Sequence, residues 1–245
     1  MRNIGDAMTR WIDQGCDSAV ACTLRFSWYF CAGVGFCGDG DRSAAGVCVV
    51  IQLSAISGIV LAAGASSRME EGNKLLLPWG EKCVIEEVVE KVCEVGLGEV
   101  IVVTGHQREQ VEDKLGEHPV RIVHNGEFAE GMASSIRVGV EAAEGKGYLL
   151  VLGDMPKVRG ETMDRVASLL KYETAMAVPV IGEKRGHPVG IGGAYREELL
   201  ALEGDRGARP VLQQNFHRVI EVEVRDLGIF VDVDTQEAYW KAREG

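Results

Sequence analysis

From residue 56 onward, short apolar runs alternate with segments whose apolar residues recur every three or four positions. The runs are typical of buried strands, and they lie at residues 57–63, 99–104, 120–124 and 148–153. Helical spacing first occurs in the segment that begins at Val84 and ends at Gly96, a residue that suits a left-handed C-cap. It occurs again at residues 107–115 and 132–143.

The remainder of the chain continues this alternation. It predicts helices at residues 161–171, 195–202, 208–214 and 236–243. It predicts strands at residues 174–180, 187–191, 219–224 and 229–231. Alternating strands and helices build an α/β domain of the Rossmann-like type, with a mostly parallel central sheet covered by helices on both faces. In such a domain, ligands bind beyond the carboxyl ends of the strands.

Residues 1–55 differ in composition from the rest of the chain. They contain no Lys and no Glu, and their most apolar stretch is interrupted by Arg25 and preceded by Asp6, Asp13 and Asp17. A secretory or membrane-spanning segment would instead be flanked by basic residues, and the cysteines form no C-x-x-C pair for a metal site. We therefore expect a poorly specified extension at residues 1–55, which leaves open whether it belongs to the native protein, and one domain at residues 56–245.

Charge narrows the range of partners. The formal net charge is −11 and the isoelectric point is about 5.0. An acidic chain does not offer a broad basic surface for nucleic acid, although small anions need only a few local charges. We expect no nucleic-acid and no membrane partner, and a cytoplasmic location.

The loop after the first strand is the strongest candidate for chemistry. Small residues from Leu61 to Ser67 let backbone N–H groups approach a polyphosphate, and Arg68 and Lys74 add positive charge. The loop is neither a G-x-G-x-x-G fingerprint nor a P-loop. A glycine-rich turn with one exposed arginine is the competing interpretation.

Carboxylates follow two of the apolar runs. Asp154 comes directly after residues 148–153, where a carboxylate beside a ligand crevice is a natural Mg²⁺ ligand. Asp232 and Asp234 share one side of an extended segment. We favour Asp232 as the metal ligand and Asp234 as the N-cap of the last helix, and the reverse assignment stays open.

The order of these motifs resembles the molybdenum cofactor nucleotidyltransferases, most closely their cytidylyltransferase branch. The resemblance covers residues 56–245 and rests on motifs at 61–68 with Lys74, 131–136, 153–156, 187–189, 204–209 and 232–235. It implies an enzyme that joins CMP from CTP to the terminal phosphate of molybdopterin and releases pyrophosphate, with Mg²⁺ as cofactor.

The resemblance also assigns residues. The implied nucleotide contacts are Leu61, Ala62, Ala63, Gly64, Ser66, Ser67, Arg68, Lys74, Thr104, Asn125, Ser134 and Ser135. Arg68, Lys74 and Asp154 are the implied catalytic residues, and Asp154 and Asp232 the metal ligands. For Ser134 and Ser135, hydroxyls and free N–H groups at a helix start would suit a phosphate. His187 and Arg209 are implied contacts of the acceptor.

Two alternatives remain. Ala63 stands where the guanylyl branch has glycine, which favours CTP, but transfer of GMP or of another nucleotide to a phosphorylated acceptor stays open. A non-catalytic carrier of the molybdenum cofactor is the second alternative, although it would not need both Asp154 and Asp232. A molybdenum hydroxylase that receives the product is a compatible partner.

Overall fold

The computed structural model describes residues 50–66 and 72–244. The chain divides into two units, Met1–Val47 and Cys48–Gly245, and the first lies outside the described residues. In the second unit, Ile51 is buried and its N–H donates to the carbonyl of Lys171. Ile51 therefore belongs to the packed core of this unit.

Within the described residues, a sheet of eight strands forms the centre of this unit. Its strands are β1 (Ile56–Ala62), β4 (Glu99–Thr104), β5 (Arg121–His124), β6 (Gly147–Leu152), β7 (Met176–Ile181), β8 (Lys184–Arg185), β9 (Val189–Gly192) and β10 (Val219–Glu223). Their order is β10-β7-β9-β6-β1-β4-β5, and β8 pairs with β7. Only β8 and β9 among these strands run antiparallel to their neighbours, which confirms the prediction of a mostly parallel sheet.

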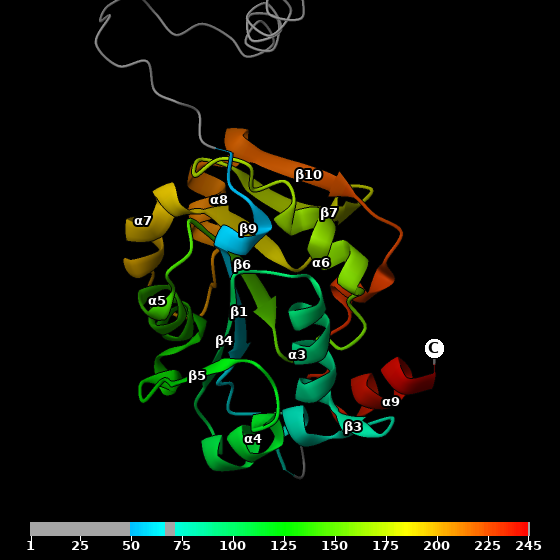
Figure 1. Ribbon diagram of the computed structural model, residues 1–245. Coiled ribbons are helices and arrows are strands. Elements are labelled where there is room, and N and C mark those ends of the chain that lie inside the picture. The colour runs from blue at the N-terminus through cyan, green and yellow to red at the C-terminus, as the bar shows by residue number, and fades with distance from the viewer. Residues whose placement is uncertain (1–49, 67–71, 245) are drawn as a thin grey trace, which may run out of the picture. The chain divides into compact units, whose positions relative to one another are not determined.

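Helices cover both faces of the sheet, because alternate strand residues point to opposite sides. Val60 and Ala62 of β1 belong to one core with α3 (Val84–Glu94), α4 (Arg108–Leu115) and α6 (Gly160–Ala167). Ile59 belongs to a second core with α5 (Met132–Ala142), α7 (Arg196–Leu200) and α8 (Arg209–Gln214). Figure 1 shows the resulting three layers. The predicted α/β fold class is confirmed.

The smaller elements lie at the margins. A hairpin of β2 (Pro78–Trp79) and β3 (Lys82–Cys83) contacts the last helix, α9 (Gln236–Glu244), through a hydrogen bond of 2.5 Å from the Tyr239 hydroxyl to the Pro78 carbonyl. The 3₁₀ turns are η1 (Leu53–Ala55), η2 (Lys74–Leu76), η3 (Phe128–Glu130), η4 (Gly193–Tyr195), η5 (Phe216–Arg218) and η6 (Leu227–Phe230).

The predicted strand at residues 229–231 is wrong, since the chain forms η6 there. The Asp226 carboxylate accepts a hydrogen bond from the Gly228 N–H at 3.0 Å and starts the turn. Gly228 also lies against the backbone of Lys157, where an added Cβ would be 2.2 Å from the carbonyl oxygen. This close packing favours a turn over an extended strand. The pattern of apolar residues in the sequence does not reveal it.

No helix in the described part of the chain is long and apolar enough to cross a membrane.

Cys83 is the N-cap of α3 and is expected to be unreactive. Its side chain accepts from the N–H at the third helical position, while the Glu86 carboxylate accepts from the Cys83 N–H at 2.8 Å. Burial, followed by the Glu86 carboxylate, raises the pKa of the Cys83 thiol to about 11. At pH 8 only about one thiol in a thousand would then be ionised. Iodoacetamide at pH 8, followed by peptide mass mapping, should label Cys83 far more slowly than a cysteine peptide; equal rates would contradict this.

Candidate active site

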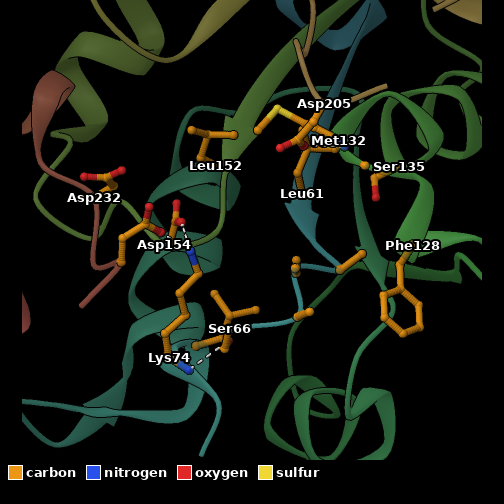
Figure 2. A pocket seen from close by; sticks show the side chains of 17 residues that line it. Leu61, Ser66, Lys74, Phe128, Met132, Ser135, Leu152, Asp154, Asp205 and Asp232 are labelled. Atoms are coloured by element: carbon orange, nitrogen blue, oxygen red, sulfur yellow. Dashed lines mark hydrogen bonds and ion pairs between the residues drawn. The ribbon is translucent and has the colours of Figure 1, made fainter. Parts of the chain in front are cut away.

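A cavity of about 310 Å³ opens at the carboxyl ends of β1 and β6, where a parallel sheet is expected to bind its ligand (Figure 2). Its polar lining includes Ser66, Lys74, Ser135, Asp154, Asp205, Asp232 and Asp234. Its other lining residues are Leu61, Ala62, Ala63, Gly64, Ala65, Leu75, Phe128, Gly131, Met132 and Leu152. The structure thus brings together most of the residues assigned from the loop and carboxylate motifs.

The loop after β1 folds back onto η2. Ser66 has a positive φ of 52°, and its hydroxyl accepts from the Lys74 N–H at 3.2 Å. The Asn73 side chain accepts from the Leu75 N–H at 3.0 Å and caps η2. Lys74 is therefore held at the cavity wall by its backbone. Two other predicted phosphate contacts, Ser67 and Arg68, lie outside the described residues.

Lys74 connects two carboxylates from different parts of the chain. Its Nζ lies 2.5 Å from Asp154 Oδ2 and 2.5 Å from Asp234 Oδ1. Burial acts to lower the pKa of Lys74, but attraction to Asp154 and hydrogen bonds with both carboxylates outweigh burial, so the pKa is raised above its ordinary value. The ammonium is therefore charged at neutral pH.

Asp232 and Asp234 reach the cavity from the segment before α9. The Val233 N–H donates to the Asp154 carbonyl at 2.9 Å and ties this segment to the end of β6. Partial desolvation raises the pKa of Asp232, although the residue as a whole is exposed, and repulsion from Asp234 and Asp154 adds to the effect. The proposed cap at Asp234 is wrong: the Thr235 hydroxyl accepts from the Ala238 N–H at 3.1 Å, so Thr235 caps α9 and Asp234 pairs with Lys74.

The carboxylates fit a magnesium ion with few protein ligands. Asp154 Oδ1 is buried and has no hydrogen-bond partner among the described residues, which leaves one oxygen of this carboxylate for a cation. Within residues 50–66 and 72–244, no group of three His, Cys, Asp or Glu side chains is arranged to enclose a metal. Mg²⁺ needs no such group, because it takes one or two carboxylates and completes its shell with phosphate oxygens and water.

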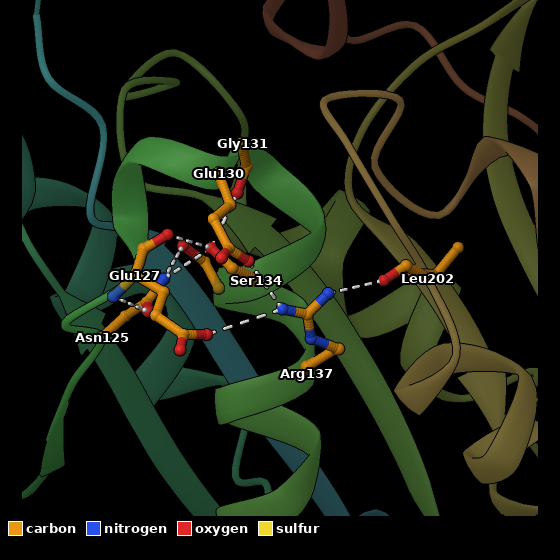
Figure 3. A network of polar contacts seen from close by, with 8 residues as sticks. Asn125, Glu127, Glu130, Gly131, Ser134, Arg137 and Leu202 are labelled. Carbon is orange, nitrogen blue, oxygen red and sulfur yellow. Dashed lines mark hydrogen bonds and ion pairs between the residues drawn. The ribbon is translucent and has the colours of Figure 1, made fainter.

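Asn125 and the serine pair form a buried network at the start of α5 (Figure 3). The Asn125 amide donates to the hydroxyls of Ser134 at 2.8 Å and Ser135 at 3.0 Å. The Ser134 hydroxyl also contacts the carbonyls of Glu127 and Gly131. Of these three polar side chains, only that of Ser135 lines the cavity. The network fixes the turn before α5.

The expectation of free N–H groups at this helix start is wrong. The Met132 N–H donates to Asp205 Oδ1 at 3.0 Å, and the Ala133 N–H donates to the Gly204 carbonyl at 3.0 Å. The Ser134 N–H donates to the Gly131 carbonyl at 3.3 Å. The loop before α8 thus binds two of these donors, and the third bonds to the turn before α5 itself. Thr104, another predicted contact, is fully buried; its hydroxyl donates to Glu112 at 2.8 Å and it does not line the cavity.

A second cavity, of about 450 Å³, adjoins the first. Both are lined by Leu61, Met132, Leu152 and Asp205, so these residues separate them. The second cavity contains both predicted acceptor contacts, His187 and Arg209, together with Arg185 and Arg206, which the motifs did not single out. Burial lowers the pKa of His187 despite the nearby Asp154, and within residues 50–66 and 72–244 the buried His187 Nδ1 has no hydrogen-bond partner. The guanidinium groups of these arginines suit an anionic ligand.

Asp205 caps a helix that lies far from it in the sequence. Gly204-Asp205 suggests a local turn, whereas the carboxylate binds the first N–H of α5. We predict that Asp205→Ala lowers the free energy of unfolding by about 1 kcal/mol, the usual effect of losing a cap. Asp205→Asn keeps an oxygen acceptor and should lose less. Urea unfolding compares the two variants, and equal losses would contradict a capping role.

Comparisons with known proteins agree with this geometry. The family described as MobA-like NTP transferase domain matches residues 58–219. The nicotine blue oxidoreductase of Paenarthrobacter nicotinovorans is 32% identical over 77% of this chain and 97% of its own length. The molybdenum cofactor cytidylyltransferase of Escherichia coli is 25% identical over 78% of this chain and 97% of its own length.

Solved structures show the same fold. A nucleotidyl transferase from Methanothermobacter has a TM-score of 0.70 and 31% identity, and the match covers 77% of this chain and 96% of that protein. The manganese complex of Rv0371c from Mycobacterium tuberculosis has a TM-score of 0.67 and 28% identity, and covers 78% of this chain and 98% of that protein. The chain therefore belongs to the MobA-like NTP transferase family and is a nucleotidyltransferase.

Proposed function

We propose that the protein transfers CMP from CTP to the terminal phosphate of molybdopterin and releases pyrophosphate. The observation that carries the proposal is one cavity that combines the loop after β1, Lys74 and the carboxylates of Asp154 and Asp232, beside a second cavity with basic side chains. The similarity to the E. coli cytidylyltransferase supports this choice of substrates. Ala63, which lines the first cavity, supports CTP over GTP.

The reaction needs alignment and charge neutralisation rather than a strong base. An oxygen of the acceptor phosphate forms a bond to the α-phosphorus of CTP, and the bond between the α-phosphorus and the bridging oxygen to the β-phosphate breaks. The acceptor phosphate is already ionised at pH 7. Negative charge grows on the leaving pyrophosphate, so we assign its stabilisation to the Lys74 ammonium, together with Arg68.

We assign Mg²⁺ binding to Asp154 and Asp232, both at the cavity wall. When bound, the cation supplies positive charge to phosphate oxygens. The manganese complex of the M. tuberculosis relative supports a divalent cation in this fold. In our proposal Ser66, Ser67, Ser135 and the backbone of Leu61–Gly64 contact the nucleotide, while Thr104, Asn125 and Ser134 shape the surrounding backbone.

We assign the acceptor to the second cavity. His187 and Arg209 line it, and because both cavities share Leu61 and Met132, ligands in the two cavities would meet at this wall. His187 is neutral at pH 7, since burial lowers its pKa, and can donate a hydrogen bond to an acceptor oxygen. Transfer of the product to a molybdenum hydroxylase in the cytoplasm is part of the proposal.

Pyrophosphate release tests the proposal. Purified protein is incubated with Mg²⁺ and molybdopterin-type cofactor, and CTP, GTP and ATP are supplied in separate reactions. Release with CTP alone supports cytidylyl transfer, and release with GTP alone would replace it by guanylyl transfer. No release with any nucleotide, despite bound cofactor, would favour a carrier.

An oxidoreductase is the second candidate, because the Paenarthrobacter relative bears that name. Reduction of nicotine blue at the expense of an added hydride donor, such as a reduced nicotinamide nucleotide, by a protein that releases no pyrophosphate with any triphosphate would support this activity instead.

A further inference from the structure

The Lys74 ammonium lies between two carboxylates, as a bound metal cation would. Both contacts measure 2.5 Å, and the side chains of Lys74, Asp154 and Asp234 are only 14%, 16% and 28% exposed. Figure 2 shows the lysine side chain directed from η2 toward the Asp154 carboxylate. Low exposure weakens screening by water, so these contacts are stronger than those of a surface ion pair.

The same carboxylate cannot serve two cations equally well. Asp154 Oδ2 contacts Lys74, and Asp154 Oδ1 is buried with no hydrogen-bond partner in the part of the chain that the structure describes. A divalent cation at Asp154 would therefore lie within a few ångströms of the ammonium. Like charges at that separation repel strongly in a partly buried site. Lys74 and a divalent cation are thus competitors for Asp154.

The lysine can leave without disturbing the loop that holds it. Its backbone is fixed by the hydrogen bond from the Lys74 N–H to Ser66 and by the Asn73 cap of η2. Its Nζ contacts only the two carboxylates among the hydrogen bonds described for residues 50–66 and 72–244. A side chain anchored in this way can reorient about its own bonds when a more negative group enters the cavity.

We propose that Lys74 is the internal counter-ion of the ligand-free site, which keeps divalent cations off Asp154 until a triphosphate enters. The negative charge of a triphosphate attracts the ammonium away from the carboxylates and brings its own divalent cation. Metal and nucleotide therefore bind together, and the free protein binds metal weakly. Asp234 is the positioning residue that holds the ammonium at Asp154. The inference rests on the proposed nucleotide site.

The first test measures Mn²⁺ alone, without nucleotide or acceptor. Free Mn²⁺ is quantified by electron paramagnetic resonance during titration of wild type, Lys74→Met and Lys157→Met. Lys157 is a matched control because it does not line the cavity. Its Nζ lies over the Trp79 ring instead, 5.9 Å from the ring centroid. We expect Lys74→Met to bind Mn²⁺ about tenfold or more tightly than wild type, and Lys157→Met to match wild type. Unchanged or weaker binding by Lys74→Met would overturn the proposal.

The second test uses the wild-type chain, so it does not depend on the folding of a variant. Acetic anhydride labelling with mass mapping gives the acetylation rates of Lys74 and Lys157. We expect Lys74 to react several-fold more slowly than Lys157, and Mn²⁺ alone at high concentration to raise its rate. Equal rates, or no response to Mn²⁺, would refute the competition. Neither test involves transfer, so a failure here leaves the pyrophosphate result to decide the proposed function.

Discussion

Asp154→Asn is expected to lower kcat by a factor on the order of 10²–10³, the usual effect of losing one preorganised electrostatic contact. The substitution keeps the shape of the side chain and removes the negative charge proposed to hold Mg²⁺. The loss should appear in pyrophosphate release at saturating CTP and acceptor. The fold should persist, because the Asp154 backbone carbonyl still accepts from the Val233 N–H and Lys74 keeps Asp234.

A matched control distinguishes the loss of the Asp154 charge from the loss of a carboxylate elsewhere on the protein. Asp113→Asn removes a carboxylate on the exposed side of α4, away from both cavities, and should retain wild-type kcat. The circular dichroism of both variants should match wild type. Near-native turnover by Asp154→Asn would remove Asp154 from the mechanism.

The architecture could be predicted from the sequence because buried strands and helices have recognisable patterns of apolar residues. Apolar runs such as residues 99–104 face helices on both sides, and the six residues of β4 coincide with that run. The helical spacing from Val84 likewise reports the face of α3 that packs on the sheet. Because β1 and β6 are parallel neighbours, the loop after β1 lies beside Asp154, which follows β6.

The partners within the site could not be predicted in the same way. Lys74 and Asp234 are 160 residues apart, and Asp205 caps α5 from 73 residues away. Local rules assign such residues to the nearest helix, as they did for Asp234. Contacts between distant loops depend on how the loops pack, and hydrophobic periodicity carries no information about this.

Asp226→Ala is expected to give the largest loss of stability among the substitutions considered, about 3 kcal/mol. The Asp226 carboxylate is buried and accepts from the Arg159 N–H at 2.9 Å, the Thr162 hydroxyl at 2.7 Å and the Gly228 N–H at 3.0 Å. It therefore caps η6 and ties η6 to the N-cap residue and the first turn of α6. Hydrogen bonds to a charged group contribute about 1.5–3 kcal/mol each, and part of this is recovered when water or neighbouring groups adjust.

Urea unfolding measures the effect as a lower midpoint with an unchanged slope. Glu161→Ala removes a carboxylate from the exposed side of the same first turn of α6 and should change stability by less than about 1 kcal/mol. Because Asp226 lines neither cavity, the folded Asp226→Ala protein should retain its kcat at low temperature. A loss of stability as small as that of Glu161→Ala would show that the three donors find other partners, whereas a loss of kcat without a loss of stability would connect Asp226 to the site itself.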